Sequence, residues 1–586
     1  MGPGVRHLTA PRGNLASRAV IEAARRHGWW SDPLLAPETP GDSSDPGSVD
    51  QVIDHLGLTD PGPGDLGLLY EALLHPAQRA AGAHYTPADV ARRLVTAALG
   101  EHRPGDGTSP VTVWDPTCGG GAFLLAAADA LHDLGHGPSV IVSEMLWGTD
   151  VDSGAVAVAD AALRWWAEVR GADAGSGAHL NVADVFLSGC PVPEGCLAVV
   201  GNPPFQGQMR GETVRDRERN RRLRERWGEV IGPYTDTAAL ALVVGVSALR
   251  PTGRLAMVLP TSVLGARDAA GVRDAVSAVA ALTGLWVAAE PVFSAEVDVC
   301  ALVLTVGGDA PVQRWRGRSF HRLADAEAPV DGRSWAPLAA AALGVPEPVV
   351  STSGTLADVA EVSAGFRDEY YGLIGHVHEG PAGLDIGQLL GHGAGGEQRH
   401  LGPLITSGLI EPGRVGWGER PVRFAKADYR RPVVDLSSLR AAGGRAAARV
   451  DALTVPKLLV ATQTKVGEAA VDERGTWVAS TPIITAVAPF EWLWKLAAVV
   501  CSPVGSALAA AATAGTGRAT GSIKHSVASV RELPLPVDDG AWVVGAEALR
   551  LGNREEFVAA MAAAYRLVDG SGVLRTWWTE RAPWDR

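Results

Sequence analysis

Short apolar runs alternate with longer Ala- and Leu-rich runs over residues 62–310. The run VTVWD precedes AFLLAAADALHDLG, and CLAVVGNPP precedes TAALALVVGVSALRPTG and then RLAMVLP. The short runs have the length and composition of buried strands, whereas the longer runs are typical of helices. This alternation predicts a mostly parallel α/β sheet with helices on both faces, and such sheets bind ligands at the carboxyl ends of their strands.

The hydrophobic pattern changes at both ends of this region. Residues 1–61 are rich in Pro, Gly, Asp and Ser, which favours a loosely ordered lead-in with two short helical segments. Beyond residue 345 the period is lost, because Gly-rich breaks separate short β-like segments such as RVGWGERPVRFAK. We therefore predict an α/β domain over residues 62–345, an α+β domain over 346–539 and a helical tail over 540–586.

Composition restricts the broad class of the protein. Apolar residues make up 46% of the 586 positions and charged residues 20%, as in ordinary globular proteins. No apolar run has the length of a membrane span, and the first residues lack the pattern of a signal peptide, so we expect a cytoplasmic protein without membrane contact. The five cysteines form no CxxC pair, which favours reduced thiols and predicts no metal site.

The lysines are unevenly distributed. The net charge of −13 argues against a nucleic-acid partner, but all five lysines fall in one C-terminal stretch, from Lys426 to Lys524. A codon bias toward Arg explains why lysines are few but not why they cluster, so the stretch is either a chance cluster or a surface that faces an anion. The absence of lysine from residues 1–425 disfavours a nuclease centre with an Asp/Glu-x-Lys motif, and the chain has no P-loop.

Residues 113–125, VWDPTCGGGAFLL, have the pattern of a strand that turns into a helix through three glycines. Glycines let a backbone approach a ligand closely, and the N–H groups at a helix start attract anions. Asp115 ends this strand, and Asp150, in LWGTDVD, is expected at the end of the next one, where a carboxylate can accept bonds from ribose hydroxyls. Asp184 ends a third run and could accept from an adenine amino group. Asp150 and Asp184 could instead be simple helix caps.

Two further segments place polar groups next to rigid backbone. In HYTPADVARRLV, Thr86 is expected to cap a helix that starts at Pro87, and a free carboxylate would be favoured at the same helix end. In VVGNPPFQG, Asn202 and the peptide oxygen of Pro203 can accept both hydrogens of one –NH2 group and draw its nitrogen toward a tetrahedral geometry. Phe205 offers a ring on which a flat base can stack, so the segment suits direct attack of an amine on an activated methyl group. The alternative is a plain Pro-Pro turn after a buried strand.

The order HYTP, DPTCGGGAF, GTDVD, GNPPF and TGRLAMVLPTSVL resembles that of methyltransferases that use S-adenosylmethionine (SAM). Within that class, the chain is most similar to the N6-adenine DNA methyltransferases with a C-terminal target-recognition domain. The resemblance covers residues 62–310 well and the C-terminal module more weakly. It implies a Rossmann-like class I α/β fold, SAM as cofactor and double-stranded DNA as partner. The residues implied in SAM binding are Tyr85, Thr86, Asp115, Pro116, Gly119, Gly121, Phe123, Asp150 and Asp184.

The resemblance also implies how the target base is held. Phe293, in EPVFSAEVDVCALVLTV, would hold the base from the side opposite to Phe205. A base within duplex DNA cannot reach such a pocket, so it must be flipped out at a cost of about a few kcal/mol. The sequence departs from many relatives at Val185, where an aromatic ring is common, so the residue that stacks on the cofactor adenine is not identified. The implied catalytic segment is Asn202, Pro203, Pro204 and Phe205.

Two basic regions are candidates for DNA contacts. Residues 209–227 contain eight arginines just after the catalytic segment. They form either a solvated helix face or a clamp on DNA phosphates, with Arg219 and Arg222 as contacts. In the C-terminal domain we expect loops to read bases in a groove and lysines to contact phosphates. The lysines assigned to this role are Lys426, Lys457, Lys465 and Lys524.

Three other functions share parts of this pattern. Release-factor glutamine methyltransferases have the same NPP-aromatic motif but lack the large C-terminal module, and an RNA base methyltransferase and a catalytically silent DNA-recognition subunit are further alternatives. The expected function is transfer of a methyl group from SAM to N6 of adenine at a specific DNA site, within a restriction–modification or phage-defence system. We expect any nuclease or other defence activity to belong to separate subunits.

Overall fold

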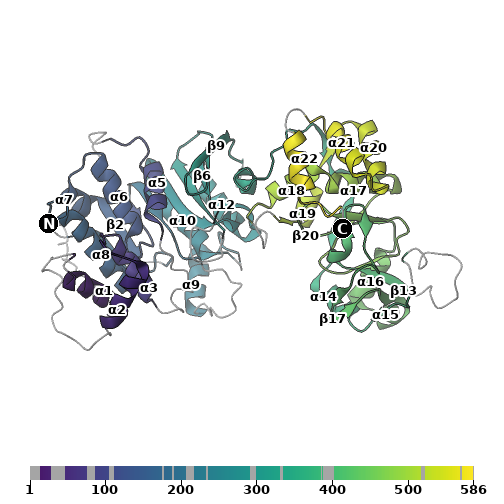
Figure 1. The fold of residues 1–586 in the computed structure, drawn as a ribbon, viewed down its shortest axis with the longest axis horizontal. Helices are drawn as coiled ribbons and strands as arrows, with labels where there is room; N and C mark the ends of the chain where they lie inside the picture. The colour runs from purple at the N-terminus through teal and green to yellow at the C-terminus, as the bar shows by residue number, and fades with distance from the viewer. Residues whose placement is uncertain are drawn as a thin grey trace. The chain divides into compact units, whose positions relative to one another are not determined.

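The computed structural model divides the chain into two compact units, Met1–Leu338 and Ala339–Arg586 (Figure 1). This boundary lies close to the one expected at residue 345. The structure describes residues 14–27, 29, 46–74, 86–103, 111–173, 177–187, 190–205, 217–232, 235–288, 290, 298–329, 334–383, 386, 401–515, 522–567 and 571–584.

A nine-stranded sheet forms the centre of the first unit. Its strand order is β3-β2-β1-β4-β5-β7-β6-β8-β9, and the first five strands in this order run parallel. Strand β7 runs antiparallel to both of its neighbours, and β9 runs antiparallel to β8. The prediction of a mostly parallel α/β sheet is therefore confirmed. The strands are β1 (Val113–Asp115), β2 (Leu146–Asp150), β3 (His179–Val182), β4 (Cys196–Gly201), β5 (Leu249–Pro260), β6 (Ala280–Val287), β7 (Val299–Val306), β8 (Val312–Arg316) and β9 (His321–Ala326).

Two groups of helices cover this sheet. In the first group, α6 packs against α5 and α8, and α5 contacts β4 and β5; in the second, α10 and α12 pack together, and α10 also contacts β4 and β5. Because both groups reach the same two strands but pack separately, they cover opposite faces. Helix α10, TAALALVVGVSA, is apolar all around and is buried along most of its length. The helices are α5 (Ala88–Leu99), α6 (Ala122–Asp133), α8 (Ser153–Glu168), α10 (Thr237–Ala248) and α12 (Ala270–Ser277).

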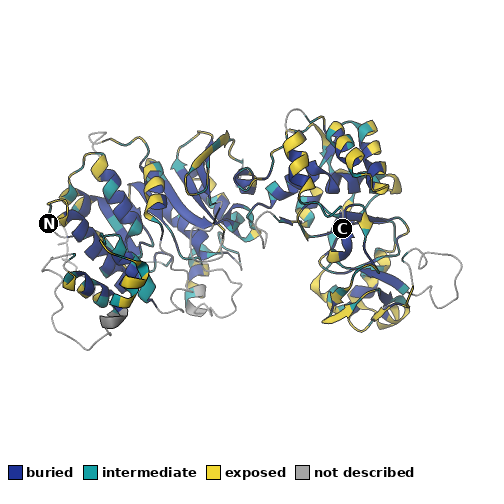
Figure 2. Cartoon of the chain, viewed as in Figure 1, coloured by how far each residue is buried: buried dark blue, intermediate teal, exposed yellow. Residues whose placement is uncertain are grey.

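Three N-terminal helices belong to the same unit. The two short helices expected in residues 1–61 are present as α1 (Leu15–Arg26) and α2 (Pro46–Leu56), and α3 (Asp65–Leu73) follows them. Their apolar side chains are buried in the hydrophobic core that α6 and α8 also form (Figure 2). The expectation of a loosely ordered lead-in is therefore wrong for these helices, because α1 and α3 pack on α8 and α2 packs on α1 and α3.

The second unit is an α+β domain built on two four-stranded sheets, with strand orders β11-β23-β19-β21 and β12-β18-β13-β22. The expected C-terminal tail is not a separate part, because its helices share one core with α17 and α18. The strands are β11 (Glu361–Ala364), β12 (Val377–Glu379), β13 (Leu401–Ile405), β18 (Pro432–Asp435), β19 (Lys457–Val460), β21 (Ala469–Asp472), β22 (Val478–Ala479) and β23 (Ile484–Val487). The helices are α17 (Phe490–Cys501), α18 (Pro503–Ala512), α20 (Asp539–Arg550), α21 (Arg554–Ala564) and α22 (Ser571–Thr579).

None of the helices within the described ranges is long and apolar enough on its own to cross a bilayer. By length and composition alone, the consecutive helices α17 and α18, which meet at an angle of 63°, satisfy the criterion as a pair.

Lys457 is the one predicted DNA contact that the structure places in the protein interior. Its side chain is fully buried, and Nζ donates to Oδ2 of Asp472 at 2.5 Å. The pair forms because Lys457 and Asp472 lie opposite each other in the antiparallel strands β19 and β21. Asp472 also accepts backbone N–H bonds from residues 475–477. The predicted contact of Lys457 with phosphate is therefore wrong: the lysine neutralises a buried carboxylate.

We expect Lys457→Met to destabilise the second unit by about 3–5 kcal/mol, because removal of one partner leaves a buried, uncompensated charge. Urea unfolding followed by far-UV circular dichroism measures the loss. Lys465→Met, at an exposed position of the same domain, is the matched control and should change stability by no more than about 0.5 kcal/mol. Equal effects of the two substitutions would contradict the structural role assigned to Lys457.

Candidate active site

The carboxyl ends of three adjacent strands bring the predicted site residues together. Strand β1 pairs in parallel with β2 on one side and with β4 on the other. Asp115 ends β1, Asp150 ends β2, and Asn202 directly follows β4. Because parallel strands end at the same edge of a sheet, side chains separated by up to 87 positions in the sequence converge there.

The glycine turn between β1 and α6 has the backbone geometry that the sequence predicted. Gly119 and Gly121 have φ values of +50° and +91°, which favour glycine, and the N–H of Gly119 donates to Oδ2 of Asp150 at 2.9 Å. Within the described residues no side chain caps α6, and its first turn contains no acidic residue. The N–H groups at this helix start are therefore suited to an anionic ligand group. Pro116 precedes the glycines and Phe123 follows them. Both residues, which the resemblance also assigns to SAM binding, are buried.

Asp115 is a buried carboxyl group that lies against the backbone of the catalytic segment. Its Oδ1 accepts a hydrogen bond from the Thr117 N–H at 3.0 Å, and a Cβ atom added to Gly201 would lie 2.7 Å from the same oxygen. Burial raises the pKa of Asp115 to about 8, and the nearby Asp150 carboxylate adds to this rise. Burial also raises the pKa of Asp150. Two buried carboxyl groups with raised pKa values favour a cationic ligand group near them.

Asn202 is held by a residue from a distant segment. Its Nδ2 donates to Oγ1 of Thr86 at 3.1 Å, which makes Oδ1 the acceptor end of the amide, and this oxygen is shielded from solvent. The expectation that Thr86 caps α5 is wrong, because the cap position is Pro87 and no side-chain cap bond forms there. The Thr86 hydroxyl instead orients the amide. Phe205 is partly buried against the core of the first unit.

Asp184 follows β3 and is paired with one of the arginines predicted to contact DNA. Its Oδ2 accepts a hydrogen bond from Nε of Arg219 at 2.8 Å, and its Oδ1 accepts from the N–H of Phe186 at 3.1 Å. Arg219 lies on α9 (Arg217–Trp227), whereas Arg222 on the same helix is exposed. The two arginines therefore have different surroundings, although the sequence assigned them one role.

The glycine turn and the Asp150 loop have further neighbours that sequence reasoning missed. Gly67 of α3 packs on Gly120, so closely that a Cβ atom at Gly120 would lie 2.7 Å from the Gly67 Cα. Tyr70, on the same helix, donates its hydroxyl to Oδ2 of Asp152 at 2.6 Å, and Asn14 Nδ2 donates to Oδ1 of Asp152 at 3.2 Å. The glycine within the apolar helical run DLGLLYEAL was the available signal, because such a glycine often marks close packing.

Three of the predicted lysine contacts lie on the surface of the second unit. Lys426 is exposed in the tight turn between β16 (Val422–Phe424) and β17 (Ala427–Tyr429) and has a φ of +69°. Lys465 and Lys524 are exposed and close to each other, because β20 (Gln463–Thr464) pairs with β24 (Ile523–Lys524). These lysines can reach an external anion, and their contact with phosphate stays a prediction.

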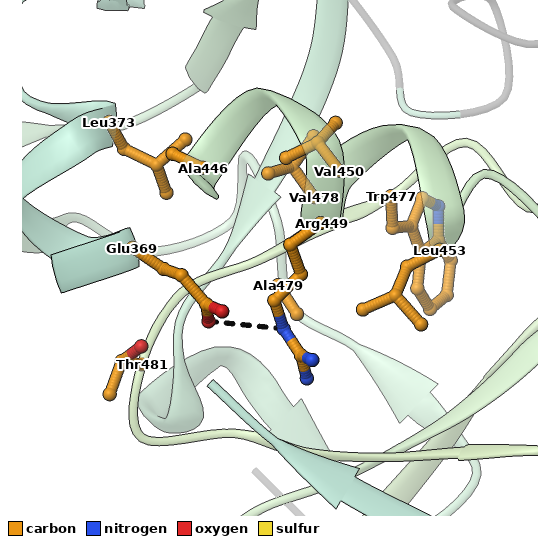
Figure 3. Close-up of a pocket in the computed structure, with 10 residues that line it drawn as sticks. All are labelled: Glu369, Leu373, Ala446, Arg449, Val450, Leu453, Trp477, Val478, Ala479 and Thr481. Atoms are coloured by element: carbon orange, nitrogen blue, oxygen red, sulfur yellow. Dashed lines mark ion pairs between the residues drawn. The ribbon is translucent and has the colours of Figure 1, made fainter. Parts of the chain in front are cut away.

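Two cavities lie outside this group of residues. A groove of about 780 Å³ runs beside α5 and is lined by cationic and aromatic side chains, among them Arg92, Arg254 and Trp315. In the second unit, the lining of a pocket of about 20 Å³ includes Glu369 and Arg449, which form an ion pair at 3.1 Å (Figure 3). That volume holds a single water molecule and excludes a nucleobase.

Two predicted site residues, Tyr85 and Phe293, lie outside the described residues. The prediction that the chain has no metal site finds no contradiction in the described ranges, where no group of three or more His, Cys, Asp or Glu side chains could hold an ion.

The raised pKa of Asp115 predicts a specific pH dependence of stability. Between the ordinary pKa of 3.8 and the folded-state value of about 8, the folded protein retains a proton that the unfolded chain releases. The folded state therefore loses stability as the pH rises through this window, by about 1.4 kcal/mol per pH unit. Asp115→Asn removes the titration, so its stability relative to the unsubstituted protein should increase from pH 5 to pH 8. Urea unfolding at several pH values, without ligand, measures this difference, and a difference independent of pH would contradict the burial of an uncharged carboxyl group.

Comparisons with known proteins agree with this arrangement. The model of the family "N-6 DNA Methylase" matches residues 63–314, which include all three strand ends described above. A curated relative, the Type II methyltransferase M.XamI of Xanthomonas campestris pv. amaranthicola, is 30% identical over 175 residues, which are 29% of this chain and 28% of the relative. The chain thus matches less than a third of the length of that relative.

A solved structure shows the same fold at low sequence identity. The Type IIL restriction-modification enzyme MmeI, solved in complex with DNA, superposes with a TM-score of 0.54 and 11% identity, over 94% of this chain and 86% of that chain. The type IIG restriction endonuclease BpuSI has a TM-score of 0.45 and 13% identity, over 98% of this chain and 78% of that chain. The family match agrees with the resemblance inferred from the sequence motifs, and it covers residues 63–314 of the chain.

Proposed function

We propose that the protein is a site-specific DNA methyltransferase that transfers the methyl group of SAM to N6 of an adenine flipped out of duplex DNA. The observation that carries the proposal is the placement of the Asn202 amide, oriented by Thr86, directly after β4 and next to the buried Asp115. The family match supports the same reaction.

The residues at the strand ends suit SAM as the cofactor. The two buried carboxyl groups, Asp115 and Asp150, can accept hydrogen bonds from an ammonium group and from ribose hydroxyls, and the uncapped start of α6 can receive a carboxylate. In addition, Oγ1 of Thr117, within the turn, is buried and has no hydrogen-bond partner among the described residues, as expected for a group that meets a ligand. Bound SAM supplies a methyl group on a positively charged sulfur.

The catalytic segment holds the attacking amine. Asn202 Oδ1 and the peptide oxygen of Pro203 would each accept one hydrogen of the adenine –NH2 group and so turn the nitrogen lone pair outward. As the N–C bond forms, the bond from the methyl carbon to sulfur would break and S-adenosylhomocysteine would leave. The amine becomes acidic only as it gains the methyl group, so no base is needed before the attack and the proton would be released to solvent afterwards. The ring of Phe205 stacks on the adenine, which stabilises the flipped base by about 1–3 kcal/mol.

The names of the relatives support a biological setting. The curated relative is named a Type II methyltransferase, and MmeI is a restriction-modification enzyme. We infer that this protein methylates DNA in the cytoplasm, at the nucleoid, as part of a restriction–modification or phage-defence system. Because residues 1–425 contain no lysine for an Asp/Glu-x-Lys centre, a separate subunit would supply DNA cleavage. The exposed Lys426, Lys465 and Lys524 would contact phosphates while loops of the second unit read the sequence.

The direct test is transfer of labelled methyl from SAM. We expect incorporation at N6 of adenine in duplex DNA, located by digestion to nucleosides and mass spectrometry. RNA of the same sequence should accept little label. Equal or greater labelling of RNA would favour an RNA base methyltransferase, and binding of DNA without any transfer would favour a silent recognition subunit.

Asn202→Ala should lower the rate of transfer by at least about 10²–10³-fold, because it removes an acceptor that orients the attacking nitrogen. The affinity for SAM, measured by calorimetry, should stay nearly unchanged. Asn202→Asp is the matched control: it keeps a side-chain oxygen as acceptor and should retain more activity than the Ala variant. Loss of SAM binding in Asn202→Ala would show that the residue belongs to the cofactor pocket.

A further inference from the structure

Helix α9 contacts the loop that follows β3 at every residue from 184 to 187. Arg219 binds the Asp184 carboxylate, and Arg226 Nη1 donates to the carbonyl oxygens of Val185 and Leu187. The indole Nε1 of Trp227 donates to the carbonyl oxygen of Phe186 at 2.8 Å. Four successive residues of the loop are therefore bonded to a single helix.

These contacts come from one face of α9. Arg219, Leu223, Arg226 and Trp227 follow the spacing i, i+4, i+7 and i+8, which places them together on a helix. Leu223 is buried, with 2% of its surface exposed, and the Arg226 guanidinium lies 4.5 Å from the centre of the Trp227 ring. This inner face is packed and hydrogen-bonded, so the solvated-helix interpretation does not apply to it.

Three further arginines of α9 lie in a different environment. Arg221, Arg222 and Arg224 are exposed, and Arg221 pairs with Glu225 at 2.6 Å. These cations can meet phosphates, whereas Arg219 has only 24% of its side chain exposed and is already bonded to a carboxylate. The Nε bond to Asp184 directs the Arg219 guanidinium toward the loop after β3.

We propose that α9 holds the cofactor-adenine loop and that Arg219 is a positioning residue, which acts through Asp184 on recognition of the cofactor's exocyclic amine. The inference rests on the proposed function, because it requires SAM in the pocket. Asp184 is only 17% exposed, and its Oδ1 is already bonded to the N–H of Phe186. The Arg219 guanidinium holds Oδ2, so both oxygens of the carboxylate are fixed in direction. Each oxygen keeps a second lone pair, and a carboxylate accepts a hydrogen bond from an amine but repels the oxygen of a carbonyl.

The role of α9 also fits its place in the sequence. The helix begins at Arg217, shortly after Phe205 of the catalytic segment, and it ends on the loop that faces the cofactor adenine. One helix therefore joins the part of the chain that receives the target base to the part that receives the cofactor.

The test compares two product-like ligands that differ in one group. S-adenosylhomocysteine carries the exocyclic amine, and its inosine counterpart carries a carbonyl at that position. For the unsubstituted protein, calorimetry should give a markedly lower Kd for S-adenosylhomocysteine than for its inosine counterpart. Arg219→Gln should weaken binding of S-adenosylhomocysteine about tenfold and leave binding of the inosine counterpart unchanged. The preference for the ligand with the amine would then be lost.

Matched variants separate positioning from simple loss of structure. Arg224→Gln, at an exposed position on the same helix, should keep the preference, and Arg219→Lys should restore part of it by keeping the positive charge. If Arg219 acts through Asp184, adding Arg219→Gln to Asp184→Asn should cause no further loss. Thermal unfolding confirms that each variant folds.

Three outcomes would overturn the inference while leaving the proposed function intact. Arg219→Gln could leave both affinities unchanged, or it could weaken binding of both ligands equally. It could also weaken binding of duplex DNA as strongly as Arg222→Gln does, which would favour a contact between Arg219 and phosphate. If the unsubstituted protein binds neither ligand, the proposed function itself fails, and the inference fails with it.

Discussion

The parallel pairing of β1 with both β2 and β4 is the constraint on which the site depends. It places Asp115 next to the backbone of Gly201, and the 2.7 Å that separates this carboxyl from a hypothetical Cβ atom leaves no room for a side chain at position 201. The residue that follows, Asn202, is consequently at a fixed distance from the glycine turn. The hydrogen bond from Asn202 to Thr86 adds α5 to the same assembly, across 116 residues of sequence. The predicted cofactor residues and the predicted catalytic segment thus lie at neighbouring strand ends of one sheet.

Local sequence patterns predicted a mostly parallel sheet and placed Asp115, Asp150 and Asn202 at strand ends. The apolar runs around β1, β2 and β4 and the glycines at 119–121 determine local structure directly, because strand length and left-handed backbone depend on neighbouring residues. The burial of Lys457 could not be predicted from local sequence patterns. Its burial depends on Asp472, which lies opposite it in another strand, and strand pairing is not visible in a run of residues. Thr86 is a similar case, because its partner Asn202 is a tertiary neighbour.

Helix α9 shows that a dense group of like charges does not have a single role. By composition, all of its arginines are equivalent, and their number suggested a surface for an anionic polymer. In the structure, Arg219 and Arg226 are used inside the first unit, where they bond a carboxylate and two peptide carbonyls. Guanidinium groups suit both tasks, since they donate several hydrogen bonds in a plane and are weakly hydrated. The helix face on which an arginine lies, and not the residue type, determines whether it bonds within the first unit or is available to an external anion.

The bonds from Asn14 and Tyr70 to Asp152 have a consequence for where this domain begins. The family match starts at residue 63, yet the Asp150–Asp152 loop is held by a side chain 49 positions earlier, and α1 and α2 cover apolar surface of the same core. A shortened protein that started at the edge of the match would expose that surface to water and release one side of the loop that carries Asp150. The unit that folds is therefore larger than the unit that sequence comparison recognises.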